Sequence, residues 1–126
     1  MSNIKLKESR FEFHRDDRGF YYLRLNEGEE FMPEDISIIN SFIIDKHDGA
    51  HLPFLIELGY GSTVSTDVQE YLTNGENRHS TADAILISTF AHKLISKFYL
   101  RRYKPAKPTK VFNTIFEALE WIEKQK

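Results

Sequence analysis

The feature that most constrains the fold of this chain is a recurring unit in which a short apolar strand runs into a capped amphipathic helix. In the C-terminal copy, Val111 and Phe112 form the strand, and Thr114 with Glu117 matches the capping-box pattern of a helix start. Either Asn113 or Thr114 is the expected cap. The side chains expected on the buried side of this helix are Ala118, Leu119, Trp121 and Ile122. Trp121 is expected to pack near the strand that precedes it.

Two earlier copies of the unit occupy the middle of the chain. The apolar runs 53–58 and 84–87 read as buried strands, and helices are predicted from Thr66 and over 90–103. Another helix is predicted between Pro33, which suits a first helical position, and the stop signal at Asp48 and Gly49. The apolar residues expected to face the sheet are Ile36, Ile39, Phe42 and Ile43, then Val68 and Leu72, and then Ala91, Leu94, Ile95 and Phe98.

An antiparallel hairpin is predicted before these units. Residues 11–14 alternate apolar and polar, a turn ends at Gly19, and 20–25 are rich in aromatic strand formers. The order β-β-α-β-α-β-α-β-α predicts an α/β fold with a mixed sheet of about five strands and about four helices, mostly parallel after the hairpin. The 126 residues suit one domain, 1–126, with its core at about 10–125. Tyr21 and Tyr22 must face opposite sides of their strand, and if one lies exposed on an edge strand it favours a homodimer.

Composition narrows the class of protein. The chain is 40% hydrophobic and has no cysteine, so a packed core without disulfides or thiolate chemistry is expected. No apolar run approaches the ~18–20 residues that span a bilayer, and the charged N-terminus does not resemble a signal peptide. These features favour a cytoplasmic protein.

The charges are strongly segregated along the chain. Residues 1–83 contain 8 Lys or Arg and 16 Asp or Glu, whereas residues 84–116 contain 7 Lys or Arg and no acid. Lys93, Lys97 and Arg101 recur every four residues, so they form a possible basic docking face on one helix. A dipolar chain suits a protein or small-anion partner, and groove-reading motifs for sequence-specific nucleic-acid binding are missing. The alternative is that these charges only keep the helix soluble.

No pattern in the sequence assembles a catalytic or metal site. His47 and His51 have the spacing of two metal ligands on a helix, but Gly49 and Pro53 place them in a loop. The segment Arg78 to Ser80, with Asp83, contains the residue types of nucleophilic catalysis, although four polar residues in one loop define no triad. We therefore predict no catalytic residue, metal or cofactor.

The order and spacing of these elements resemble the SpoIIAA-like or STAS-like domains, which include the anti-sigma factor antagonists. The similarity is greatest to small stand-alone bacterial members that are poorly characterised. The segments that carry it are 53–58, the helix start at Ser65 and Thr66, 84–87, the helix residues Ile95, Phe98 and Tyr99, the run 105–112, and Ala118, Leu119, Trp121 and Ile122.

The resemblance implies a non-enzymatic regulatory or protein-interaction domain. In anti-sigma antagonists a serine at the corresponding helix start is phosphorylated, so Ser65 and Thr66 are the aligned candidates, although the family's Asp-Ser-Ser-Gly pattern is absent here. Plain helix capping is the alternative role for these hydroxyls. Related folds in lipid-transfer proteins imply a second possible function, the binding of a small anionic or lipid-like ligand between helix and sheet. An apolar cavity of roughly 300 Å³ or more would favour the ligand, and a filled core with an exposed apolar patch would favour a partner.

Overall fold

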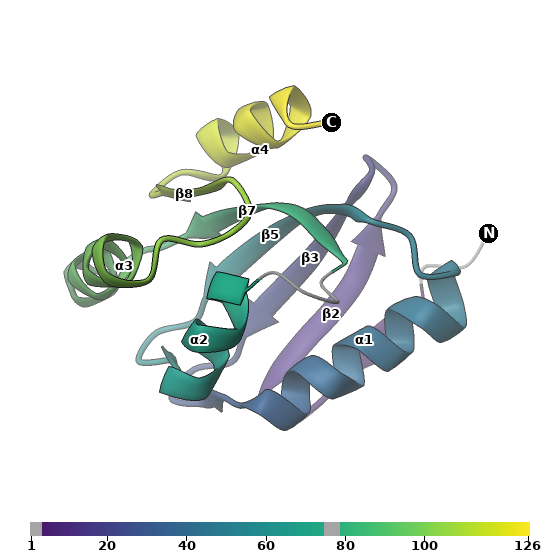
Figure 1. Cartoon of the computed structure of the whole chain (residues 1–126), viewed down its shortest axis with the longest axis horizontal. Helices are drawn as coiled ribbons and strands as arrows, with labels where there is room; N and C mark the ends of the chain where they lie inside the picture. The colour runs from purple at the N-terminus through teal and green to yellow at the C-terminus, as the bar shows by residue number, and fades with distance from the viewer. Residues whose placement is uncertain (1–3, 75–78) are drawn as a thin grey trace.

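A six-stranded sheet forms the centre of the computed structural model, which describes residues 4–74 and 79–126 (Figure 1). Its strands are β1 (Lys5–Lys7), β2 (Phe11–Asp16), β3 (Phe20–Leu25), β5 (Leu52–Leu58), β7 (Ser80–Leu86) and β8 (Thr109–Phe112), and they lie side by side in that order. The strands β1, β2 and β3 pair antiparallel, whereas β3, β5, β7 and β8 run parallel. The predicted mixed α/β fold is confirmed.

The helices are α1 (Pro33–His47), α2 (Thr66–Asn74), α3 (Phe90–Tyr103) and α4 (Ile115–Lys124). The two-residue strands β4 (Glu30–Phe31) and β6 (Thr63–Val64) pair with each other away from the main sheet. The sheet gains one strand over the expected five because Lys5–Lys7 adds to the free edge of β2. This strand has little apolar alternation, since only Leu6 among its three residues is apolar, and its polar composition hid it from the sequence pattern.

The sheet separates two apolar cores. One core lies under α1 and α2 and includes Phe13, Tyr21, Ile43 and Val68. The other lies under α4 and includes Phe20, Leu55, Ala84, Ala118 and Ile122. In Figure 1, α4 accordingly lies on the other side of the strands from α1 and α2, with α3 beside α2. The central strands β3 and β5 supply side chains to both cores, since Tyr21 and Phe54 belong to the first and Phe20 and Leu55 to the second, as the period-two geometry requires.

A buried carboxylate holds the start of α1. Asp35 is 2% exposed, accepts a hydrogen bond from the Met32 backbone N–H at 2.8 Å and forms an ion pair with Arg10 at 2.9 Å. The Arg10 guanidinium gains from this contact, which raises the pKa of Arg10 above its usual value. The helix ends where the sequence predicts it, because Asp48 adopts a left-handed backbone at φ 54°.

The predicted antiparallel hairpin of β2 and β3 is confirmed, but the predicted exposed tyrosine on an edge strand is not. Tyr21 is fully buried in the first core and Tyr22 is partly buried against the second, so the two rings do face opposite sides. However, β3 lies between β2 and β5, and it is no edge strand. The expectation that one tyrosine lies exposed on an edge is wrong, and the homodimer stays a prediction without this support.

Candidate functional site

A cavity of about 300 Å³ lies between the sheet and the helices α1, α2 and α3. Its lining extends along the parallel strands. Phe54 and Ser80 lie in the first halves of β5 and β7, whereas Leu25, Leu58 and Ile85 lie at or near the carboxyl-terminal ends of β3, β5 and β7. Ligands of open α/β sheets typically bind at this end of the strands, where the loops and helix starts converge. The volume falls at the lower end of the ~300–1,000 Å³ range of small-molecule sites.

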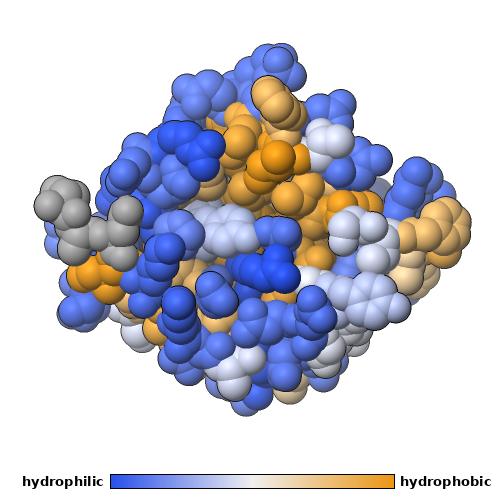
Figure 2. Space-filling view, turned by 180° about the vertical axis from the view of Figure 1, so that it is seen from behind, coloured by the Kyte–Doolittle hydropathy of each residue, from blue (hydrophilic) through white to orange (hydrophobic). Residues whose placement is uncertain are grey.

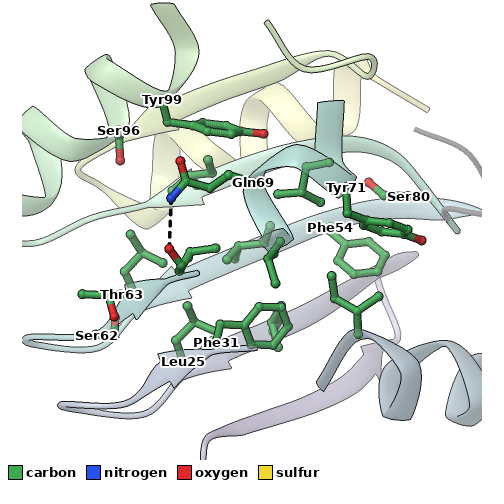
Figure 3. A pocket seen from close by; sticks show the side chains of 18 of the residues that line it. Leu25, Phe31, Phe54, Ser62, Thr63, Gln69, Tyr71, Ser80, Ser96 and Tyr99 are labelled. Atoms are coloured by element: carbon green, nitrogen blue, oxygen red, sulfur yellow. Dashed lines mark hydrogen bonds between the residues drawn. The ribbon is translucent and has the colours of Figure 1, made fainter. Parts of the chain in front are cut away.

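The lining is apolar along its length and polar at its two sides. Figure 3 shows Leu25, Phe31 and Phe54 along the floor, with Ser62, Thr63 and Ser96 at one side and Tyr71 and Ser80 at the other. Gln69 contributes little free polarity, because its side-chain amide donates to the Val64 carbonyl oxygen at 2.9 Å. This arrangement suits a molecule that is mostly apolar and has a polar group at an end.

None of the lining residues in the described part of the chain is a Lys, Arg, Asp or Glu. The histidines that line it are His79 and His92. Burial, and then repulsion from the neighbouring His51, lowers the pKa of His79 below its ordinary value, so its ring is neutral at pH 7. The cavity therefore offers no fixed charge to balance an anionic or cationic ligand.

Two segments form the polar side of the cavity that contains Ser62. One is the tight turn that carries Ser62, and the other is the start of α3, which carries His92. Gly59 to Ser62 forms the turn after β5, in which the Ser62 N–H donates to the Gly59 carbonyl oxygen at 3.0 Å. His92 lies in the first turn of α3, where Thr89 caps the helix by accepting from the His92 N–H at 3.1 Å. The two segments are joined by a 2.9 Å hydrogen bond between His92 Nε2 and the Ser62 carbonyl oxygen. Ser62 and His92 are 2% and 3% exposed.

The buried face of α3 differs from the expected one. Leu94, Ile95 and Phe98 are 53%, 52% and 63% exposed, and Ala91 is exposed as well. The buried residues of the helix are His92, Ser96 and Tyr99, and all three line the cavity, as does the predicted inward residue Ile95 despite its partial exposure. The prediction was wrong because it assumed a helix that packs on a filled core, whereas α3 packs beside a cavity and turns a polar stripe toward it.

The predicted basic residues lie on the outer surface of the same helix. Lys93, Lys97 and Arg101 are all exposed, as is Phe90, which is 72% exposed. Figure 2, which shows the face opposite to Figure 1, has a group of apolar side chains at the right edge, where α3 lies, and an apolar area extending from the region of α4. At the start of α4, Phe116 is 84% exposed. The outer surface of α3 thus mixes cations with uncovered apolar groups.

The two candidate phosphate acceptors lie at the start of α2. Ser65 is 9% exposed, and its hydroxyl oxygen accepts from the Val68 N–H at 3.2 Å, so Ser65 is the helix cap. The helix begins at Thr66, as predicted, and Thr66 itself is exposed and already helical. Phosphorylation at either hydroxyl stays a prediction, and modification of Ser65 would first have to break its cap.

The histidines of the metal-spacing pattern do not meet. His47 ends α1 and packs against Tyr21 and Phe42, with ring centroids 5.9 and 5.6 Å apart, whereas His51 packs against His79 at 5.1 Å. Burial is the main cause that lowers the pKa of His47. Within 4–74 and 79–126, no group of three or more His, Cys, Asp and Glu side chains could hold a metal.

The polar loop before β7 forms no triad among its described members. Ser80 donates directly to Asp83 across 2.6 Å, and no imidazole lies between the hydroxyl and the carboxylate. His79 instead has its Nδ1 3.3 Å from the side-chain oxygen of Asn40. Arg78 lies outside the described residues. The hydrogen bonds of this loop are those of a strand start.

Ser62, His92 and Ser96 were missed as site residues. The spacing of His92, Ser96 and Tyr99 at four and three residues does mark one helix face, but the neighbouring apolar positions gave a stronger signal for burial. Ser62 lies in a turn between Gly61 and Thr63, and nothing in the local sequence sets it apart. The signal that could have identified this site was the polar stripe of His92, Ser96 and Tyr99, which runs along α3 beside the apolar stripe.

The residues described include no helix that is long and apolar enough to cross a bilayer.

No curated protein matches the sequence. Among solved structures, the chain is similar to an uncharacterised protein of the DUF3478 family with a SpoIIAA-like fold from Shewanella loihica PV-4. The match has a TM-score of 0.54 and 17% identity, and it covers 97% of this chain and 98% of that one. At this identity the likeness shows the fold, which is SpoIIAA-like.

A family model matches most of the sequence and identifies the family of the chain, which the likeness in fold does not. The match extends over residues 16–126, from the end of β2 to the last residue, and so includes every element that lines the cavity. The chain belongs to the family described as a domain of unknown function, DUF7793.

Proposed function

We propose that this protein is a non-enzymatic binding domain that holds a small, uncharged, lipid-like ligand between its sheet and the helices α2 and α3. The observation that carries the proposal is the cavity of about 300 Å³ with its apolar floor. A filled core is the ordinary state of a domain of this size, because interiors pack as densely as organic crystals. A cavity of this volume, lined by Leu, Ile and Phe side chains, supports a role in holding an apolar molecule.

The charge pattern of the lining supports one of the two ligand classes that the sequence left open. An anion would need a cation or several donors to offset its desolvation, and the described lining contains no Lys or Arg. An uncharged ligand carries no such cost and gains from burial of its apolar surface. The cavity therefore favours the lipid-like ligand over the small anionic one. The chain has no cysteine, which fits a reducing compartment such as the bacterial cytoplasm.

Filling the cavity should abolish ligand binding without unfolding the protein. Leu72 on α2 is partly buried and lines the cavity, so Leu72→Trp extends a larger apolar side chain into it. We expect the affinity for an uncharged fluorescent probe with a twelve-carbon chain to fall by about tenfold or more. Titration of probe fluorescence measures the effect.

Leu119→Trp is the matched control, because Leu119 is also partly buried but packs in the second core, away from the cavity. Its probe affinity should equal that of the wild type. Failure of the wild type to take up the probe, or equal affinities for the wild type and Leu72→Trp, would contradict the proposed function.

The outer surface of α3 supports a second function, docking of an acidic protein partner. Exposed Phe90, Leu94 and Phe98 alternate along the helix with Lys93, Lys97 and Arg101. Interfaces combine a small apolar centre with charges that steer association, and residues 84–116 contain no acid to neutralise this face. Regulatory proteins of the resembled family act through such contacts.

A change of Lys93, Lys97 and Arg101 to Glu should leave the fold intact and prevent partner capture. The physical reason is that reversed charges repel an acidic surface, and the wild-type interaction should weaken as salt rises. Pull-down at low and high salt measures both effects. The control reverses three other exposed lysines, Lys5, Lys7 and Lys124. Recovery of the same partners by the α3 variant at the same salt would mean that the charges only keep the helix soluble.

A further inference from the structure

The side of the cavity near Ser62 contains two polar atoms that the fold leaves unsatisfied. Ser62 Oγ and His92 Nδ1 are both buried, and neither has a hydrogen-bond partner among the described residues. Both residues line the cavity. A buried polar group without a partner destabilises the folded state, so native proteins rarely keep two of them together without a function.

The hydrogen bond at the other ring nitrogen defines the chemistry of His92. A backbone carbonyl oxygen only accepts hydrogen bonds, so Nε2 must carry the hydrogen that it donates to the Ser62 carbonyl oxygen over 2.9 Å. In the neutral ring Nδ1 is then an acceptor with its lone pair free. The Ser62 hydroxyl can both donate and accept, and its hydrogen rotates about the C–O bond.

The helix α3 is oriented so that its polar side, which carries His92 and Ser96, faces the cavity. His92 and Ser96 are one helical turn apart and share the buried face, while Leu94 and Phe98 are exposed. A helix that turns polar residues inward and apolar residues outward loses part of the stabilisation that burial of those apolar side chains would give. Figure 3 shows the Ser96 hydroxyl pointing from α3 toward the strands, on the same side of the cavity as Ser62.

We propose that Ser62 and His92 bind the hydroxyl group of a long-chain alcohol or a similar neutral, hydroxyl-bearing lipid, and that its apolar chain lies over the floor of the cavity. The ligand hydroxyl donates to His92 Nδ1 and accepts from the Ser62 hydroxyl. This inference rests on the proposed function and specifies its ligand class. A carboxylate ligand fits less well, because it has no hydrogen to donate to Nδ1 and finds no cation in the described lining.

Comparison of 1-dodecanol with its methyl ether tests the assignment, because the ether keeps the chain and oxygen but has no hydrogen to donate. We expect the wild type to bind the alcohol about tenfold more tightly than the ether, as one hydrogen bond permits. In Ser62→Ala the affinity for the alcohol should fall by about threefold to tenfold. The thermal midpoint of the ligand-free variant should not fall, because the change removes an unsatisfied hydroxyl.

Thr63→Val is the matched control. It removes the neighbouring hydroxyl, which also lines the cavity, and keeps the shape of the side chain. Its preference for the alcohol should equal that of the wild type. Nitrogen NMR of the histidine rings gives a second readout that needs no variant, since the Nδ1 resonance of His92 should shift with the alcohol and not with the ether.

The outcomes separate the two proposals. Equal binding of the alcohol and the ether, with Ser62→Ala unchanged and the Nδ1 resonance unmoved, would overturn the hydroxyl assignment while leaving the cavity as a binding site. Binding of neither molecule would overturn the proposed function itself. Tighter binding of dodecanoate than of dodecanol would assign the site to an anion and contradict the inference.

Discussion

Replacing Phe13 with Ala should lower the free energy of unfolding by about 3–5 kcal/mol, the range for a large aromatic removed from a core. Phe13 on β2 is fully buried, and its ring lies 5.3 Å from Tyr21, 5.9 Å from Phe42 and 5.7 Å from Phe54, centroid to centroid. These contacts connect two strands of the hairpin to α1 and to β5. Loss of the ring therefore leaves a cavity in the first core and removes three aromatic pairs.

Urea denaturation measures the change, with equal slopes required for the comparison. Trp121→Ala is the informative control, because Trp121 is also aromatic and packs 5.7 Å from Phe112 but is only partly buried. We expect Trp121→Ala to cost clearly less than Phe13→Ala. An equal loss for the two variants, or none for Phe13→Ala, would mean that the first core does not hold the sheet together.

The architecture could be predicted because its signals are local and repeat. Thr114 caps α4 as expected, accepting from the Glu117 N–H at 3.3 Å, and its hydroxyl donates to the Glu117 carboxylate at 2.9 Å. Asp48 and Gly49 both have positive φ where the stop of α1 was predicted. Each of these features depends on neighbouring residues alone. The order of such units then restricts the sheet to few arrangements, since parallel crossovers share one hand.

The site could not be predicted because it depends on what the core leaves empty. The pattern of α3 identifies two stripes, one containing Leu94 and Phe98 and the other containing His92 and Ser96. Burial of the first stripe is the default for a helix on a filled core. A cavity lies beside α3 because of where α2 and β6 are placed. Their placement depends on contacts between residues distant in sequence, such as the parallel pair β4 and β6, and local sequence patterns do not report such contacts.

The failure at α3 and the success at α4 have one physical explanation. The helix α4 buries Ala118 and Ile122 against β5, β7 and β8, so packing alone determines which side it turns inward. The helix α3 has no such filled surface beneath it, and its inward side meets the cavity. Departures from local rules of this kind are expected at functional sites, which supports both the proposed ligand and the proposed docking surface.

Replacing Gly59 with Ala should be the most damaging change in the loops, with a cost of at least about 2–3 kcal/mol. Gly59 follows β5, and its N–H donates to the Leu25 carbonyl oxygen at 2.9 Å. A Cβ atom there would overlap that same oxygen and would lie 3.0 Å from the Glu27 nitrogen. Both are backbone atoms, so no side-chain rotation relieves the overlap, and either β3 or the turn must move.

The turn that would move carries Ser62, so Gly59→Ala should also weaken alcohol binding in the protein that remains folded. Gly28→Ala is the matched control, because Gly28 has φ +72° but no atom within 4 Å of an added Cβ. It should cost only about 1–2 kcal/mol of backbone strain and leave binding unchanged. Thermal unfolding and dodecanol titration of both variants measure the two effects. Similar midpoints for the two variants would contradict the close approach of the Gly59 Cα to the Leu25 carbonyl oxygen.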